Sequence, residues 1–429
     1  MAEVRTFAEV RAWGRTVGGV AELDDGAIVF EYDNAFRRSG LEVSPVHLPL
    51  TMAGPVRFDE LRRKEAFRGL PGVLADALPD VFGTQVIRAY YTARGDVSKA
   101  FSPVQHLLYV GERAIGALTF HPAEHLPLQA AEAEALEVRQ LVADARRIIV
   151  GDPEVAIPEI YRVGSSAGGM RPKAVVLFNP STREIRSAFA PAVHGDIPAI
   201  LKFDGVGAAE VERRLGEPQP FNRVEAAYAD MALAAGLDVP KMHLLEGPDG
   251  HAHLVVPRFD RPGGVRLHQH TLGGLLHLDY NDPGASSYEE YLRAILRLGM
   301  PHGQVLEGYR RMVFNVLAVN QDDHVKNLSF HMEPNGSWRL TPAYDLTFAK
   351  GGGWTSTHQM RVNDKRAGLT RGDLLAVAEM FGIRAPGRIV DGIGAAVADW
   401  GVHARARGVP ESTSSRIGRE LEGRAAEIG

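Results

Sequence analysis

The chain has 429 residues, a formal net charge of −5 and no cysteine. A chain of this length is too long to fold around one small hydrophobic core, so two or three domains are expected. The absence of cysteine excludes disulfides, thiolate zinc sites and cysteine nucleophiles. The acidic balance provides no global basic field, so any contact with nucleic acid would come from a local patch or from a partner chain.

The N-terminus is charged and lacks the apolar core of a signal peptide. No apolar run approaches roughly 20 residues, the length that a membrane span needs. Together with the absence of cysteine, these observations favour a cytoplasmic protein with no membrane contact.

Residues 1–125 are predicted to form a small mixed domain. Short strands bounded by turn residues are expected in three places, at 10–17, 19–23 and 27–32. Asp25-Gly26 is the expected turn of one hairpin, and residues 107–111 and 114–120 are interpreted as the strands of another. A Pro-rich stretch around residues 121–128 marks the first domain boundary.

The second predicted domain covers residues 126–262. Apolar residues at helical spacing predict a helix over 132–150, and a glycine-rich loop with unusual backbone freedom follows. A hairpin around Asn179-Pro180 is expected next, with strands at 174–178 and 184–189. A strand at 199–203, a helix at 222–236 and a last hairpin with strands at 241–245 and 251–256 follow. Asn222 is a candidate cap of the helix with Glu225 as its capping-box partner.

The third predicted domain, residues 263–429, is mostly helical. Helices are expected at 288–298, 304–320, 371–381 and 388–400, with a short strand at 337–340. His268, His270 and His277 are spaced like possible metal ligands, but no acidic partner pattern accompanies them, which favours surface or core histidines.

The segment from Asn320 to Asp345 carries the strongest chemical signal. Four residues separate Asp322 from Asn327, which is the spacing of a protein-kinase catalytic loop. There the Asp accepts the proton of the substrate hydroxyl and the Asn holds a metal ion. Asp345 is the candidate second ligand, since Mg²⁺ prefers hard oxygen ligands. The competing interpretation is a polar helix end after the apolar run 312–319.

Phosphoryl transfer from ATP also needs cations near the phosphates. Lys202 lies on an apolar strand. Its amine either binds the phosphates of the nucleotide, or the residue is an edge-strand lysine whose aliphatic part is buried while its amine reaches solvent. Glu225 either pairs with it or caps its own helix. The loop from Gly164 to Lys173 is not a Walker A sequence, but its backbone N–H groups and its cations suit phosphates.

Two further features complete the predicted nucleotide site. Ser165 and Ser166 lie at the tip of the glycine loop, where exposed hydroxyls invite self-phosphorylation. Residues 256–259 are the expected hinge, in which Phe259 either covers the adenine or belongs to the core. The parts together predict an α+β fold, in which a small sheet-rich lobe and a helical lobe form a two-lobed, protein-kinase-like unit after an additional N-terminal mixed domain.

Several motifs resemble the HipA-type serine/threonine kinases of bacterial toxin–antitoxin modules. They are Ser165-Ser166-Ala167-Gly168-Gly169-Met170-Arg171-Pro172-Lys173, Asn320-x-Asp322-x-His324-x-Lys326-Asn327-x-Ser329 and Pro342-x-Tyr344-Asp345-Leu346. The segment Gly69 to Asp80 resembles the N-terminal domain of that family, and Arg258-Phe259-Asp260-Arg261 resembles its hinge.

The resemblance implies a role for each matching residue. It implies that Asp322 is the catalytic acceptor, that Asn327 and Asp345 hold Mg²⁺, and that Ser165 or Ser166 is autophosphorylated. ATP binding is implied for Gly168, Gly169, Arg171, Lys173, Lys202, Pro257, Arg258, Phe259, His324, Lys326, Asn327, Tyr344 and Asp345. Pro257 departs from the acidic hinge residue of some relatives, so a hydrogen bond to adenine there would come from the backbone.

The family also implies partners. The expected partner is a helix-turn-helix antitoxin of the HipB type, with operator DNA contacted only through that complex, and aminoacyl-tRNA synthetases are among the family's substrates. Two other functions share the same motifs: a small-molecule phosphotransferase, and a catalytically silent nucleotide-binding scaffold of an antitoxin–operator complex. A pure operator-binding protein is disfavoured by the net charge of −5.

Overall fold

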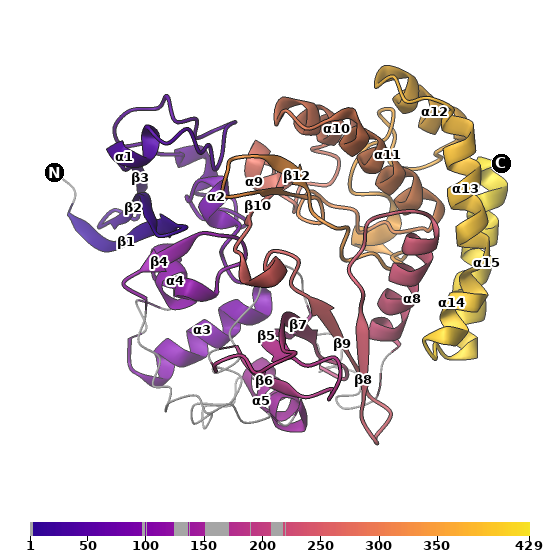
Figure 1. The fold of residues 1–429 in the computed structure, drawn as a ribbon, viewed down its shortest axis with the longest axis horizontal. Helices are drawn as coiled ribbons and strands as arrows, with labels where there is room; N and C mark the ends of the chain where they lie inside the picture. The colour runs from indigo at the N-terminus through magenta and orange to yellow at the C-terminus, as the bar shows by residue number, and fades with distance from the viewer. Residues whose placement is uncertain are drawn as a thin grey trace. The chain divides into compact units, whose positions relative to one another are not determined.

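The computed structural model describes residues 3–96, 99, 101–123, 136, 138–150, 171–188, 190–206, 218 and 220–429. Figure 1 shows the ribbon with its helices and strands labelled. The chain divides into two compact units. Unit 1 comprises residues 1–219, 243–270 and 332–337, and unit 2 comprises 220–242, 271–331 and 338–429.

Unit 1 begins with an antiparallel sheet in the order β3-β2-β1-β4. Its strands are β1 (Val4–Ala12), β2 (Arg15–Leu23), β3 (Ile28–Tyr32) and β4 (Thr119–His121). The Asp25-Gly26 turn is confirmed, with Gly26 at φ +75°. The strand predicted over 10–17 is wrong, because the chain turns within it. Trp13 and Gly14 both have positive φ, as a tight type I′ hairpin turn requires.

The helices of unit 1 are α1 (Asn34–Arg37), α2 (Gly72–Ala75), α3 (Val81–Ala93), α4 (Pro103–Val110) and α5 (Val138–Val150). The hairpin predicted at 107–111 and 114–120 is wrong: α4 takes the place of its first strand. Ser102 caps α4 by accepting from Gln105 N at 3.1 Å, and Pro103 fits the first helical position. Every residue of α4 is buried, so no helical periodicity marks it in the sequence.

A second antiparallel sheet in unit 1 has the order β6-β5-β7-β9-β8. Its strands are β5 (Lys173–Phe178), β6 (Ile185–Ser187), β7 (Ile197–Lys202), β8 (His243–Glu246) and β9 (Ala252–Pro257). Both predicted hairpins and the strand at 199–203 are confirmed. Apolar residues of α3, α5 and this sheet share one buried cluster, which includes Phe82, Leu141 and Leu201.

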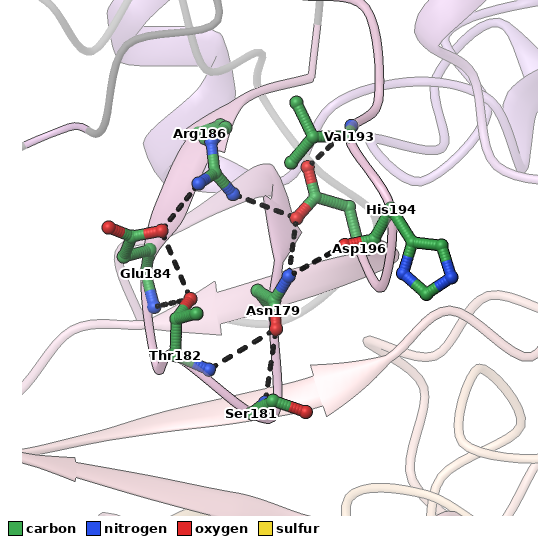
Figure 2. A network of polar contacts seen from close by, with 8 residues as sticks. All are labelled: Asn179, Ser181, Thr182, Glu184, Arg186, Val193, His194 and Asp196. Atoms are coloured by element: carbon green, nitrogen blue, oxygen red, sulfur yellow. Dashed lines mark hydrogen bonds and ion pairs between the residues drawn. The ribbon is translucent and has the colours of Figure 1, made fainter.

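Figure 2 shows the polar network that closes the β5–β6 hairpin. Asn179 accepts from the backbone N–H groups of Ser181 and Thr182 at 3.1 and 3.2 Å, and its amide donates to Asp196 at 3.2 Å. Arg186 donates to the same Asp196 carboxylate at 2.8 Å. The predicted turn at Asn179-Pro180 therefore follows from the tendency of Asn to bond the backbone two residues on.

Unit 2 is mainly helical. Its helices are α8 (Phe221–Ala234), α9 (Leu272–Leu276), α10 (Tyr288–Arg297), α11 (His302–Leu317), α12 (Arg371–Met380), α13 (Pro386–Ala398), α14 (Trp400–Ala406) and α15 (Glu411–Ile428). The chain first enters this unit at Pro220 and returns to it at Thr271, the last residue of β10 (His268–Thr271). The short strands β11 (Ser329–Met332) and β12 (Trp338–Leu340) follow α11. All four predicted helices are confirmed to within a few residues.

The predicted cap of α8 is wrong. The helix begins at Phe221, and its N-cap residue Pro220 makes no side-chain capping bond. Asn222 and Glu225 lie inside the helix and are buried. The helix predicted over 222–236 is confirmed at its C-terminal end, where Gly236 follows the last helical residues with φ +81°.

Two of the three histidines that resembled metal ligands lie in the core of unit 1. His268 bonds the carbonyl of Val43 at 2.8 Å, and His270 lies between Asp76 and Ser44 at 2.6 and 3.1 Å. These contacts support the interpretation as core histidines. Within the described ranges, no helix is both long and apolar enough to cross a membrane.

Candidate functional site

The loop between α11 and β11 brings Asp322 and Asn327 together in unit 2. The Asn327 side-chain N–H donates to the backbone carbonyl of Asp322 at 2.9 Å, and its backbone N–H donates to His324 O at 2.9 Å. These bonds close a tight turn around the four intervening residues. Because the amide nitrogen is used in this way, the amide oxygen of Asn327 is the atom suited to a metal ion.

The Asp322 carboxylate is 39% exposed and has two neighbours with N–H groups. Trp354 donates its indole N–H to the carboxylate at 2.8 Å, and His324 Nε2 lies 3.9 Å from the same oxygen. Burial raises the pKa of Asp322, and the negative charges of Asp345 and Asp323 raise it further, while His324 and the Trp354 hydrogen bond oppose this. The influence of Asp345 means that its charge lies near the candidate base.

The adjacent Asp323 has the opposite environment, because its side chain is fully buried. Its two oxygens accept from three donors: Tyr288 OH at 2.9 Å, His358 Nδ1 at 2.8 Å and Gln359 N at 2.7 Å. The donors come from α10 and from the segment after Trp354. Asp323 therefore anchors the loop in the protein while Asp322 points outward.

The Tyr344-Asp345 segment is tied to the same loop. Tyr344 donates its hydroxyl to the carbonyl of Lys326 at 2.5 Å and also contacts the hydroxyl of Ser329. Asp345 has φ +52°, a left-handed conformation that Asp and Asn adopt more readily than most residues. The carboxylate of Asp345 and the amide oxygen of Asn327 are hard ligands, so this donor set fits Mg²⁺.

The remaining nucleotide candidates of unit 2 gather around one aromatic ring. The ring of Tyr280 lies 5.5 Å from that of His324 and 4.9 Å from the amine of Lys326. Burial lowers the pKa of His324, and Lys326 lowers it further, while Asp322 and Asp345 act in the opposite direction. In the part of the chain that the structure describes, no three acidic or histidine side chains converge as a metal site, so Mg²⁺ would rely on an amide and on phosphate oxygens as well.

The predicted phosphate contacts of unit 1 lie at the end of the second sheet. Lys173 in β5 is the register partner of Lys202 in β7, and both are buried. The amine of Lys173 lies 3.4 Å from the carboxylate of Asp80. Arg171 is partly buried, whereas Ser165, Ser166, Gly168 and Gly169 lie outside the described residues.

The predicted hinge is held by buried charges. Pro257 ends β9 opposite Ala199, and Phe259 is partly buried. Arg258 donates to both oxygens of Asp260, at 3.0 and 2.7 Å, and to the carbonyl of Ala114 at 3.0 Å. The side chain of Arg258 is therefore engaged within unit 1, and its contact with ATP stays a prediction.

Asp260 is the centre of that hinge network. It also accepts from Arg261 at 2.7 Å and from Gly116 N at 2.8 Å. Burial alone would raise the pKa of Asp260, but Arg258 and Arg261 hold it well below its usual range. Burial in turn lowers the pKa of Arg261 to about 9.

Several residues of the site were missed by sequence reasoning. Trp354 follows three glycines and matches no catalytic pattern, and His358 and Gln359 lie more than 30 residues from their partner Asp323. Asp80 was noted only as part of an N-terminal motif. No local pattern marks such residues, because their role depends on a partner that is distant in the sequence.

The fold and this site together define a protein of the kinase-like class. Residues 165–400 match the HipA-like C-terminal domain, and residues 8–121 match the HipA N-terminal domain. The chain belongs to the HipA family, and the predicted fold class is confirmed.

Three known proteins illustrate the similarity. A "Putative kinase" of Haemophilus influenzae is 33% identical over 145 residues, which span 30% of this chain and 42% of that relative. "Putative kinase Y4dM" of Sinorhizobium fredii is 25% identical over 80% of this chain and 76% of its own length. The HipA, HipB and operator DNA complex of Shewanella oneidensis contains a chain with the same fold, at TM-score 0.68 and 18% identity, covering 98% of this chain and 97% of that one.

The two adjacent carboxylates should respond differently to the same substitution. Asp323→Asn is expected to lower the free energy of unfolding by about 3 kcal/mol, because it disturbs a buried carboxylate that accepts from three donors. Asp322→Asn should leave stability within about 0.5 kcal/mol, since its side chain is partly exposed. Urea unfolding of both variants measures this; equal losses would contradict the assigned environments.

Asp260→Asn should destabilise unit 1 by about 3 kcal/mol at pH 7, because it leaves buried arginines without their counter-charge. The folded pKa of Asp260 lies below its unfolded value of about 3.9. The stabilisation is thus complete above that value and is lost as the pH falls toward the folded pKa. Unfolding at pH 7 and pH 3 should show the variant's deficit shrinking with acid. Asp59→Asn, in an exposed ion pair, is the control and should have little effect at either pH.

Trp354→Phe removes the indole N–H from the Asp322 carboxylate and keeps an aromatic ring. If the hydrogen bond orients the base, we expect kcat for phosphoryl transfer to fall about tenfold, with KM for ATP changed less than twofold. Steady-state measurements of kcat and KM for the wild type and the variant test this expectation. An increase in kcat would instead identify Trp354 as a group that blocks the carboxylate.

Proposed function

We propose that this chain is an ATP- and Mg²⁺-dependent protein serine/threonine kinase that acts as the toxin of a toxin–antitoxin module. The observation that carries the proposal is the arrangement in unit 2 of a partly exposed Asp322, bonded through its backbone to Asn327 and influenced by the charge of Asp345. Kinase catalytic loops need these residue types for the same chemistry.

Each side chain has a definite task in the proposed reaction. Asp322 accepts the proton of a serine or threonine hydroxyl while the hydroxyl oxygen bonds to the γ-phosphorus and the bond from that phosphorus to the bridging oxygen of ADP breaks. A raised pKa makes the carboxylate a better proton acceptor. Asn327 and Asp345 would hold Mg²⁺, which when bound neutralises phosphate oxygens.

The other nucleotide contacts are proposed from their chemistry and their family positions. Lys173 and Lys202 supply cations for the phosphates, with Gly168, Gly169 and Arg171 from the loop. In unit 1, Pro257, Arg258 and Phe259 are proposed to receive the adenine. In unit 2, His324, Lys326 and Tyr344 are further proposed contacts of ATP. Autophosphorylation at Ser165 or Ser166 would place a negative charge in the phosphate loop and oppose nucleotide binding.

The partners are proposed from the family. The Shewanella protein of the same fold was solved with HipB and operator DNA. A helix-turn-helix antitoxin is therefore the proposed partner here, and the net charge of −5 favours DNA contact through that partner rather than directly. An aminoacyl-tRNA synthetase in the cytoplasm is the proposed class of substrate.

One labelling experiment tests the kinase activity. Wild type and Asp322→Asn are incubated with γ-labelled ATP and Mg²⁺, with and without EDTA, and the label is mapped by mass spectrometry. We expect phosphate on Ser165 or Ser166 in the wild type, its loss with EDTA, and at least a hundredfold reduction in the variant.

The same experiment separates the alternatives. Equal labelling of both proteins would remove Asp322 from its role. Retained ATP binding without labelling of the chain or of any added protein would favour the silent scaffold. Transfer to metabolites but not to proteins would favour a small-molecule phosphotransferase.

A further inference from the structure

Two lysines face each other across neighbouring strands at the predicted phosphate-binding end of the sheet. Lys173 and Lys202 are register partners in the antiparallel pair β5–β7. Directly opposite residues project from the same face of a sheet with Cβ atoms about 5 Å apart, and like charges there repel. Both residues are buried, at 4% and 8% exposure, so their charges need anions in a setting where water screens little.

One anion comes from the N-terminal part of the chain. The carboxylate of Asp80 is 1% exposed and lies 3.4 Å from the Lys173 amine. Its other oxygen accepts from Gly83 N at 2.6 Å and so caps α3. The carboxylate is therefore held by a helix whose apolar residues share a core with β5 and β7, and it has little freedom to move away from the lysine.

This contact is analogous to a known device of protein kinases, in which a helix carboxylate orients a strand lysine that touches the phosphates. The sequence leaves Glu225 open either as such a partner of Lys202 or as a cap of its own helix. In the structure an ion pair joins the neighbouring Lys173 to Asp80, and this carboxylate belongs to the segment that matches the HipA N-terminal domain.

We propose that Asp80 is a positioning residue of the nucleotide site: its carboxylate holds the Lys173 amine beside Lys202, so that the N-terminal domain sets the affinity for the phosphates. The proposal rests on the proposed kinase function. It explains why one carboxylate both caps α3 and pairs with a buried lysine, since the cap fixes the place of the charge.

The two tasks of Asp80 can be separated by two substitutions. Asn caps helices as well as Asp does but carries no charge, so Asp80→Asn keeps α3 capped and removes the negative charge beside Lys173. Asp80→Glu retains the charge but caps less well. Asp33→Asn is the matched control, because Asp33 caps α1 in the same unit by accepting from Ala35 N and Phe36 N.

The readout is the ratio of affinities for Mg²⁺–ATP and for adenosine, measured by calorimetry on the full chain. For Asp80→Asn we expect ATP to bind about tenfold more weakly while adenosine binding stays within twofold, because only ATP carries phosphates. Asp80→Glu should restore at least part of the ATP affinity, and Asp33→Asn should match the wild type.

Three other results of the binding measurements would contradict the inference. An unchanged ratio in Asp80→Asn, with the wild type binding ATP, would overturn the inference and leave the kinase proposal intact. Equal weakening of ATP and adenosine would assign Asp80 a purely structural role and also overturn it. A wild type that binds no ATP would reject the proposed function itself, and this inference with it.

Discussion

The buried carboxylate of Asp323 is the constraint on which the candidate catalytic loop depends. A charge without water is costly unless hydrogen bonds replace its hydration, and here Tyr288, His358 and Gln359 provide them. The three donors come from segments on both sides of the loop in sequence, so satisfying one carboxylate orders all of them. Asp322 is then directed outward, where a proton acceptor is useful.

Unit 1 uses the same principle at two other places. Asp260 joins the segment after β9 to Gly116, and Asp80 joins α3 to β5. Each carboxylate links parts of the chain that are far apart in sequence. Such buried pairs add little net stability compared with apolar packing, but breaking one is costly, so they specify a particular arrangement of segments.

Local sequence patterns predicted most elements of the fold and the central residues of the loop. They succeeded where turn residues flank alternating or helical periodicity, as at Asp25-Gly26 and in α10. They failed in α4, which is buried on all sides, and at Asn222, where the helix starts a residue earlier than its apparent cap. The hydrogen bond from Trp354 to Asp322 could not be predicted, because no sequence pattern around Trp354 indicates a contact with that residue.

The left-handed backbone of Asp345 has an evolutionary consequence. Asparagine tolerates that conformation as well as aspartate does, and a single nucleotide change converts one codon into the other. A homologue can thus lose the carboxylate that is proposed here to hold Mg²⁺ while its main chain keeps the same path. The charge at this position can therefore change without a change in the fold of the segment.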